Sequence, residues 1–261
     1  MTSMKRTVAN YLERVTKARI VSPHRVSFLY EEEHIRRIFD TFDIDCVFDI
    51  GANAGQYASM LRERVGYHGA IISFEPIPSL ARKLSDAAKH DKNWFIRELA
   101  LNDTAGAVRF KITTDSQFSS VRNPNSVSHD LFAGAVKIEN EIEIQTATLK
   151  SEFEFWREKI GFSRPYLKMD TQGNDLAIAK GGQEVLHKFI AIQTETSIVK
   201  LYDEIPSLSE SIDFFHNEGF QLSAFVPNNE GMFPILLETD CIFINRAQAR
   251  ATGQKSAKDF A

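Results

Sequence analysis

The chain has 261 residues, of which 43% are hydrophobic and 25% are charged, and its formal net charge is −4. This composition suits a globular protein with a sizeable core, and the acidic balance argues against nucleic acid as a partner, because phosphate recognition needs clustered Lys and Arg. No apolar stretch approaches the roughly 20 residues of a membrane span and the N-terminus lacks an apolar signal core, so we expect a cytoplasmic protein.

The two cysteines indicate the same compartment. Cys46 and Cys241 each lie inside an apolar, strand-like run. This placement is typical of small buried hydrophobes and not of a disulfide or a metal-binding pair. We therefore expect two free, buried thiols.

Residues 1–43 are predicted to form a helical N-terminal extension. Residues 4–19 place apolar side chains at helical spacing between Lys and Arg, which predicts a short amphipathic helix packed on the domain surface. Peripheral contact of this basic helix with an anionic membrane, or with a partner protein, is the alternative. A second helix is predicted over about 29–42, with the acidic run 31–33 in solvent.

Apolar runs and helical patterns alternate over residues 44–249, which is typical of a parallel sheet with helices on both faces. Strands are predicted at 45–50, 70–75, 94–101, 165–170 and 190–195, and helices at 53–64, 78–89, 149–160, 174–188 and 207–217. Gly181 and Gly182 are expected to break the helix at 174–188. The fold class is therefore α/β, with one main domain at 44–249 and a loose polar tail at 250–261.

Further strands are predicted outside this alternation. Residues 220–226 and 235–245 are strand-like and joined by a short turn, so they should be antiparallel and the sheet should finish with a reversed strand. The stretches 106–112 and 138–146 are predicted to be edge strands with one face in water. The polar segment 113–135 between them is predicted to be a long loop, and a loop of that length in a compact domain is usually functional or disordered.

A turn suited to a nucleoside cofactor follows the first predicted strand. Asp49 ends that strand, Gly51, Asn53 and Gly55 form the turn, and Tyr57 begins the helical pattern. The next strand ends in Glu75, and Pro76 stops it. Acids at the carboxyl ends of adjacent parallel strands meet at one edge of the sheet, where nucleoside cofactors bind. The alternative is that both acids are helix N-caps and that the glycines only make a tight turn.

The glycine spacing separates two kinds of cofactor. A dinucleotide site needs Gly-x-Gly-x-x-Gly, because the pyrophosphate approaches the helix N-terminus closely. Asn53 stands at the second glycine position and the third glycine is missing, which disfavours a nicotinamide cofactor. The turn instead suits S-adenosylmethionine (SAM), since Asp49 can meet the ammonium of its amino-acid tail and Glu75 can accept both ribose hydroxyls.

Four segments together resemble the FkbM-type SAM-dependent methyltransferases. They read Asp-Ile-Gly-Ala-Asn-Ala-Gly-Gln-Tyr at 49–57, Phe-Glu-Pro at 74–76, Ala-Leu-Asn-Asp at 100–103 and Leu-Lys-Met-Asp-Thr-Gln-Gly-Asn-Asp at 167–175. The resemblance implies a Rossmann-like, seven-stranded methyltransferase fold with a reversed final strand. It also implies methyl transfer to hydroxyl groups, often on sugars of glycans and glycolipids or on natural products. Carried over, the methionine moiety is held by Asp49, Gly51, Asn53 and Gly55, the ribose by Glu75, and the adenine lies near Ala100, Leu101 and Asp103.

The candidate catalytic residues lie at the ends of the later strands. Lys168 and Asp170 share one face of the strand at 165–170, and Asp170 falls at its carboxyl end. Glu195 ends the neighbouring strand, and His129 in the polar loop is a further candidate base. An alcohol acceptor needs a general base or a metal-bound oxygen to remove its proton.

Asp170, Glu195 and His129 each have an alternative role. Asp170 can be the N-cap of the helix that begins near Asn174, and His129 can be an ordinary solvated residue. Asp170 and Glu195 can share a divalent cation, bind acceptor hydroxyls directly, or repel each other so that one holds a proton, so metal use stays open.

The predicted function is SAM-dependent O-methyl transfer to a sugar, glycan, glycolipid or similar small polar acceptor. A nicotinamide-dependent oxidoreductase is one alternative. A SAM-fold module that serves as an assembly partner without catalysis is the other.

Overall fold

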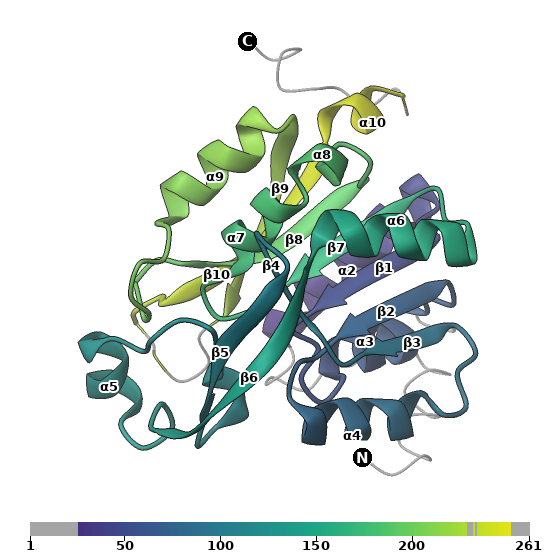
Figure 1. Cartoon of the computed structure of the whole chain (residues 1–261). Helices are drawn as coiled ribbons and strands as arrows, with labels where there is room; N and C mark the ends of the chain where they lie inside the picture. The colour runs from purple at the N-terminus through teal and green to yellow at the C-terminus, as the bar shows by residue number, and fades with distance from the viewer. Residues whose placement is uncertain (1–25, 229–231, 233, 252–261) are drawn as a thin grey trace, which may run out of the picture.

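Seven strands of the computed structural model form one sheet in the order β3-β2-β1-β7-β8-β10-β9 (Figure 1). Their bounds are β1 Cys46–Ile50, β2 Ala70–Phe74, β3 Trp94–Arg97, β7 Pro165–Met169, β8 Ala191–Ser197, β9 Phe220–Asn228 and β10 Glu238–Asn245. Neighbouring strands are parallel except at β10, which is antiparallel to both β8 and β9. The predicted reversed final strand is therefore confirmed, and it lies one position in from the sheet edge.

The structure describes residues 26–228, 232 and 234–251. The helix expected over 4–19 and the tail from 252 onward lie outside these residues. No helix in this described part of the chain is both long enough and apolar enough to cross a membrane. Cys46 and Cys241 are both buried and free, as predicted.

Helices cover both faces of the sheet. They are α2 Val26–Phe42, α3 Gln56–Met60, the π-helical turn η2 Leu61–Val65, α4 Pro78–Ala88, α6 Leu149–Ile160, α7 Asp175–Gly181, α8 Gln183–Leu186, α9 Leu208–Asn217 and α10 Arg246–Ala251. Because side chains alternate along a strand, β1 directs Phe48 into the core under α6 to α9 and Val47 into the core under α2, α3 and η2. The break predicted at Gly181 and Gly182 is present between α7 and α8.

A second, three-stranded sheet has the order β4-β6-β5 and stands apart from the main sheet (Figure 1). It consists of β4 Ala100–Asn102, β5 Gly106–Thr113 and β6 Ile138–Thr148. The predicted strands at 106–112 and 138–146 are both present, and β5 lies at an edge as predicted. The edge position predicted for 138–146 was wrong, because β6 lies between β4 and β5. The prediction of one strand over 94–101 was also wrong, because a turn with a hydrogen bond from the Leu99 amide to the Arg97 carbonyl separates β3 from β4.

The segment predicted as a long loop at 113–135 contains two short helices, η3 Ser116–Phe118 and α5 Ser126–Phe132. Asp115 caps η3 and Asn125 caps α5, each by accepting a backbone N–H. The small sheet packs its inner face, which includes Phe110 and Ile144, against Ile77 and Leu80 at the start of α4. This contact places the loop that carries η3 over the carboxyl ends of the main strands.

Candidate active site

A row of polar side chains crosses the sheet on the face covered by α2 and α3. Asp49 of β1 is in register with Ser73 of β2 and with Lys168 of β7, and Lys168 is in register with Gln193 of β8. A cavity of about 1240 Å³ opens above the carboxyl ends of these strands, and Asp49 and Lys168 form part of its wall. The other lining residues include Glu195 within β8 and residues of the turns after β1, β2 and β7. Further lining residues come from α2, α3 and η2, from the small sheet and η3, and from β9 and β10.

The turn after β1 is shaped by close packing. Gly51 has φ +82, and a Cβ there would lie 1.9 Å from the carbonyl oxygen of Asp170, so only glycine lets β1 and β7 end side by side. Gly55 has φ +87, and a Cβ there would lie 3.0 Å from the Trp94 ring. Gly51 and Asn53 line the cavity, whereas Gly55 is buried behind them against the core.

Glu75 closes the base of this turn. Its Oε2 accepts the backbone N–H of Asn53 at 2.8 Å and its Oε1 accepts that of Ile77 at 2.8 Å, next to the start of α4. The residue is 4% exposed and lines the cavity. Burial raises the pKa of the Glu75 carboxyl to about 7, against the two backbone hydrogen bonds that lower it. Glu75 is therefore not the N-cap of the alternative interpretation, because the N-cap of α4 is Ile77 and no side chain caps that helix. Its two oxygens instead hold the turn after β1 and the backbone that precedes α4.

Asp49 is buried at the start of the same turn. Its Oδ2 accepts the Ser73 hydroxyl at 2.8 Å, and the Ser73 oxygen in turn accepts the Trp94 indole N–H at 2.9 Å. Burial raises the pKa of Asp49 to about 6. No helix begins at Asp49, so it is not the N-cap of the alternative interpretation.

The remaining predicted cofactor residues divide into two groups. Tyr57, Pro76, Ala100 and Leu101 line the cavity. The Tyr57 hydroxyl donates to Gln193 Oε1 at 2.9 Å, and its ring lies 5.6 Å from the Lys168 ammonium. Asp103 is exposed and does not line the cavity, because the chain turns away from the cavity after β4.

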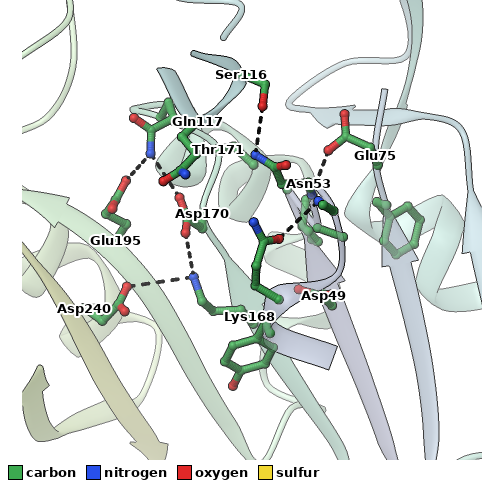
Figure 2. Close-up of a pocket in the computed structure, with 18 of the residues that line it drawn as sticks. Asp49, Asn53, Glu75, Ser116, Gln117, Lys168, Asp170, Thr171, Glu195 and Asp240 are labelled. Atoms are coloured by element: carbon green, nitrogen blue, oxygen red, sulfur yellow. Dashed lines mark hydrogen bonds and ion pairs between the residues drawn. The ribbon is translucent and has the colours of Figure 1, made fainter. Parts of the chain in front are cut away.

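Three of the four predicted catalytic residues come together in the cavity, as Figure 2 shows. The Lys168 ammonium lies 3.3 Å from Asp170 Oδ2. Gln172 Nε2 donates to Asp170 Oδ1 at 3.1 Å and to Glu195 Oε2 at 2.8 Å, so it bridges the two acids. Asp170 thus faces Lys168 and does not cap α7, whose N-cap is Asn174.

The charges in this group depend on one another. Burial lowers the pKa of Lys168, but the carboxylates of Asp170, Asp240 and Glu195 raise it further, so the net shift is well upward and Lys168 is an ammonium at neutral pH. Burial and the neighbouring Asp170 raise the pKa of Glu195 well above its usual range.

The fourth predicted catalytic residue is elsewhere. His129 is exposed on α5 and is not part of the cavity wall, so the structure does not bring it to the other three. The polar segment was expected to hold it in a loop over the site. Instead, Asn125 starts a helix there and directs His129 into solvent.

Three polar residues of the site, Gln193, Glu31 and Asp240, were not among those predicted from the sequence. Gln193 accepts both the Tyr57 and the Tyr166 hydroxyls at 2.9 Å through Oε1, and donates from Nε2 to Glu31 at 2.7 Å and to Asp240 at 3.2 Å. Glu31 was expected in solvent, but it lines the cavity, and burial raises its pKa to about 7. The signal for Gln193 was its period-two spacing from Glu195, while Glu31 and Asp240 required knowledge of the sheet order.

Metal binding has no built site in the part of the chain that the structure describes. There, no group of three or more His, Cys, Asp or Glu side chains is arranged to hold a metal ion. The acids at the ends of β7, β8 and β10 are instead joined through Lys168, Gln172 and Gln193.

Comparison with known proteins gives the family. Solved structures that match this chain include Aeropyrum pernix fibrillarin in complex with natively bound S-adenosyl-L-methionine, at 13% identity and TM-score 0.43, with 77% of this chain and 66% of the fibrillarin chain covered. Another is the magnesium protoporphyrin IX methyltransferase of Synechocystis with bound SAM, at 7% identity and TM-score 0.45, with coverage of 94% and 98%. A search of curated protein sequences finds no match. The family model of the methyltransferase FkbM domain matches residues 49–222, which is more than half of the sequence, and the chain therefore belongs to the FkbM methyltransferase family.

Proposed function

We propose that this methyltransferase transfers the methyl group of SAM to a hydroxyl of a sugar or a similar small polyol. One observation carries the proposal. The acids suited to SAM, Asp49 and Glu75, and the groups suited to an alcohol, Lys168, Asp170 and Glu195, line one cavity above adjacent strand ends. Methyl transfer is an in-line displacement, so donor and acceptor need to be held in one enclosure.

The residues present fit SAM on the donor side. Each oxygen of Glu75 accepts one backbone N–H, and a carboxylate oxygen has a second lone pair that can accept a ribose hydroxyl. Asp49 is available at the base of the turn for the ammonium of the methionine moiety. Ala100 and Leu101 provide apolar wall for the adenine ring.

On the acceptor side, the chain's residues manage one proton. SAM supplies an electrophilic methyl group on a positively charged sulfur. In the proposed reaction the acceptor hydroxyl would lose its proton to the Asp170 carboxylate as its oxygen takes the methyl group, and the sulfur would keep the electron pair of the broken carbon–sulfur bond. Lys168 stays protonated beside Asp170 and can donate to the acceptor oxygen to orient it. Gln172 fixes Asp170 by its hydrogen bond to Oδ1.

The test combines cofactor binding and product identification. Glu75→Ala removes both ribose acceptors, so SAM should bind about 10-fold to 100-fold more weakly by isothermal titration calorimetry. Glu98→Ala, which removes an exposed acid near β3, should leave the dissociation constant unchanged. An unchanged affinity in Glu75→Ala would contradict the proposed SAM pose.

The acceptor is identified with methyl-labelled SAM. Incubation of the wild-type chain with labelled SAM and fractionated cell extract should give a labelled methyl ether on a small polyol or glycan, and Glu75→Ala should give much less label. Retention of NAD without SAM binding would instead support the oxidoreductase alternative. SAM binding with no transfer across the fractions would support the assembly-partner alternative.

A further inference from the structure

The cavity wall as a whole carries an excess of acid. Among the described residues that line the cavity, eight are Asp or Glu and two, Arg64 and Lys168, are cations. Arg64 already pairs with Glu32 at 3.0 Å. Lys168 is shared between Asp170 at 3.3 Å and Asp240 at 3.8 Å, and it also donates to the Met169 carbonyl. One ammonium therefore serves several carboxyl groups.

Two of these acids stand directly opposite each other. Asp240 of β10 is in register with Glu195 of β8 across an antiparallel strand pair, and both side chains lie in the cavity wall. Like charges in this position destabilise a sheet, because opposed Cβ atoms lie only about 5 Å apart. A pairing of this kind needs a compensating group, and a cation between the two acids is the most direct one.

Asp240 supplies an independent sign of a missing partner. The residue is 9% exposed, and its Oδ2 accepts Gln193 at 3.2 Å. Its Oδ1 is buried and has no hydrogen-bond partner among the described residues, and the Lys168 ammonium at 3.8 Å is beyond hydrogen-bond distance. A buried carboxylate oxygen without a donor is costly, so a donor from a bound molecule fits this place.

The pKa values of the neighbouring acids reflect the same crowding of negative charge. Burial and the Asp170 charge raise the pKa of Glu238 to about 8, and burial raises the pKa of Asp240 even though Lys168 lowers it. A neutral hydroxyl can donate to Oδ1 but leaves the excess charge in place. An anionic group at this position would add a further negative charge.

Figure 2 shows where this site lies. Asp240 and Glu195 are on one side of Lys168 and Asp170, and Asn53 and Glu75 are on the other. In the proposed pose the ammonium of SAM lies beside Asp49 and its sulfonium faces Asp170, so neither charge lies between Asp240 and Glu195.

We propose that the acceptor is an amino alcohol, such as an amino sugar, whose protonated amine lies between Asp240 and Glu195 and donates to Asp240 Oδ1. This inference rests on the proposed function, because it names the class of hydroxyl acceptor. The amine anchors the acceptor and stays unmethylated, since the proton it would need to lose is held by the two acids. The hydroxyl to be methylated then lies toward Asp170.

The test uses three sugars that differ in charge at one carbon. The full chain saturated with S-adenosylhomocysteine is titrated at neutral pH with 6-amino-6-deoxy-D-glucose, D-glucose and D-glucuronate. The amine should bind about tenfold or more tightly than D-glucose, because a hydrogen bond to a charged group is worth roughly 1.5–3 kcal/mol, and D-glucuronate should bind most weakly. Equal or undetectable binding of the three sugars would overturn the proposal.

Variants locate the site. Asp240→Asn keeps the shape and the oxygen that accepts Gln193, and it should remove the preference for the amine. Asp86→Asn, on the exposed face of α4, is the matched control and should keep that preference. If Asp240→Asn fails to fold, the comparison of the three sugars on the wild type still tests the proposal.

Other outcomes are separable. If the wild type does not bind S-adenosylhomocysteine, the proposed function is contradicted. If it binds S-adenosylhomocysteine but does not prefer the amino sugar over D-glucose, only this inference is contradicted. If Mg²⁺ binds in a manner that depends on Asp240 and the amine does not bind, the site takes a metal ion and the amine proposal is overturned. Methylation found on the nitrogen of a processed amino sugar would overturn the anchoring role.

Discussion

Asp49 and Glu75 are buried carboxyl groups, and without bound SAM their ionisation is unfavourable because burial disfavours the charged form. Burial raises the pKa of Asp49 from 3.8 to about 6 and that of Glu75 from 4.5 to about 7. Because both values are raised by folding, the stabilisation they contribute is fully present below about pH 4 and is lost as the pH rises through 6 to 7. SAM presents an ammonium and hydroxyl donors to these groups, so it binds the ionised form.

SAM affinity should therefore rise with pH. Between pH 5.5 and pH 8 the dissociation constant is expected to fall roughly tenfold to a hundredfold, as the two carboxyl groups lose their protons. Calorimetric titration of the wild type at several pH values measures this change. Glu75→Gln cannot ionise at that position and should show a much smaller pH dependence, and an equally steep profile in this variant would rule out Glu75 as the titrating group.

At the scale of elements, the contact between the ends of β1 and β7 builds the site. Gly51 and Gly66 have nearly the same backbone conformation, with φ +82 and +81. A Cβ at Gly51 would collide with the Asp170 carbonyl at 1.9 Å, whereas nothing lies within 4 Å of a Cβ at Gly66. The pair thus separates the cost of a left-handed conformation from the cost of pushing two strands apart.

Gly66→Ala should cost about 1 kcal/mol of unfolding free energy, from the left-handed conformation alone. Gly51→Ala should cost roughly 3 kcal/mol or more, because β7 must also move, and it should displace Asp170. Urea denaturation of both variants measures the difference. Similar losses in the two variants would mean that the close approach at Gly51 relaxes without cost.

Some helices and strands were predictable from the sequence and others were not. Strands that are buried on both sides, such as β1 and β7, were predicted to within a residue or two, because an unbroken apolar run marks them. The small sheet was missed, since the alternating pattern of β5 and β6 tells which face is buried but not which strand lies alongside. The polar segment before β6 gave no sign of α5, whose only sequence signal is the Asn125 cap.

At the scale of the whole molecule, the acceptor side unites parts that are distant in the chain. Glu31 comes from α2 and Asp240 from β10, near opposite ends of the described sequence, and they meet only because β10 inserts beside β8. The sequence predicted Asp49 and Glu75 because each follows a strand in an adjacent β-turn-α unit. No local pattern marks Glu31 or Asp240, so their role required the order of strands in the sheet.

Gln193 connects the four elements that form the acceptor side. It is fully buried, and its amide bonds Tyr57 of α3, Tyr166 of β7, Glu31 of α2 and Asp240 of β10. Gln193→Leu keeps much of the volume but removes this partner from two buried groups, on Tyr166 and Asp240, and from two half-buried groups, on Tyr57 and Glu31. Each such loss costs about 1–3 kcal/mol, so the variant should lose roughly 3 kcal/mol or more of unfolding free energy.

The control for this prediction is Gln145→Leu, on the exposed face of β6, which should change the unfolding free energy by less than about 0.5 kcal/mol. Denaturant unfolding of both variants is the measurement. Because Glu31 and Asp240 lose a shared donor in Gln193→Leu, their carboxyl groups should also bind protons more readily, and the stability loss should grow as the pH rises from 6 to 8. A loss that is independent of pH would show that Gln193 acts by packing alone and does not set the charge of the acceptor side.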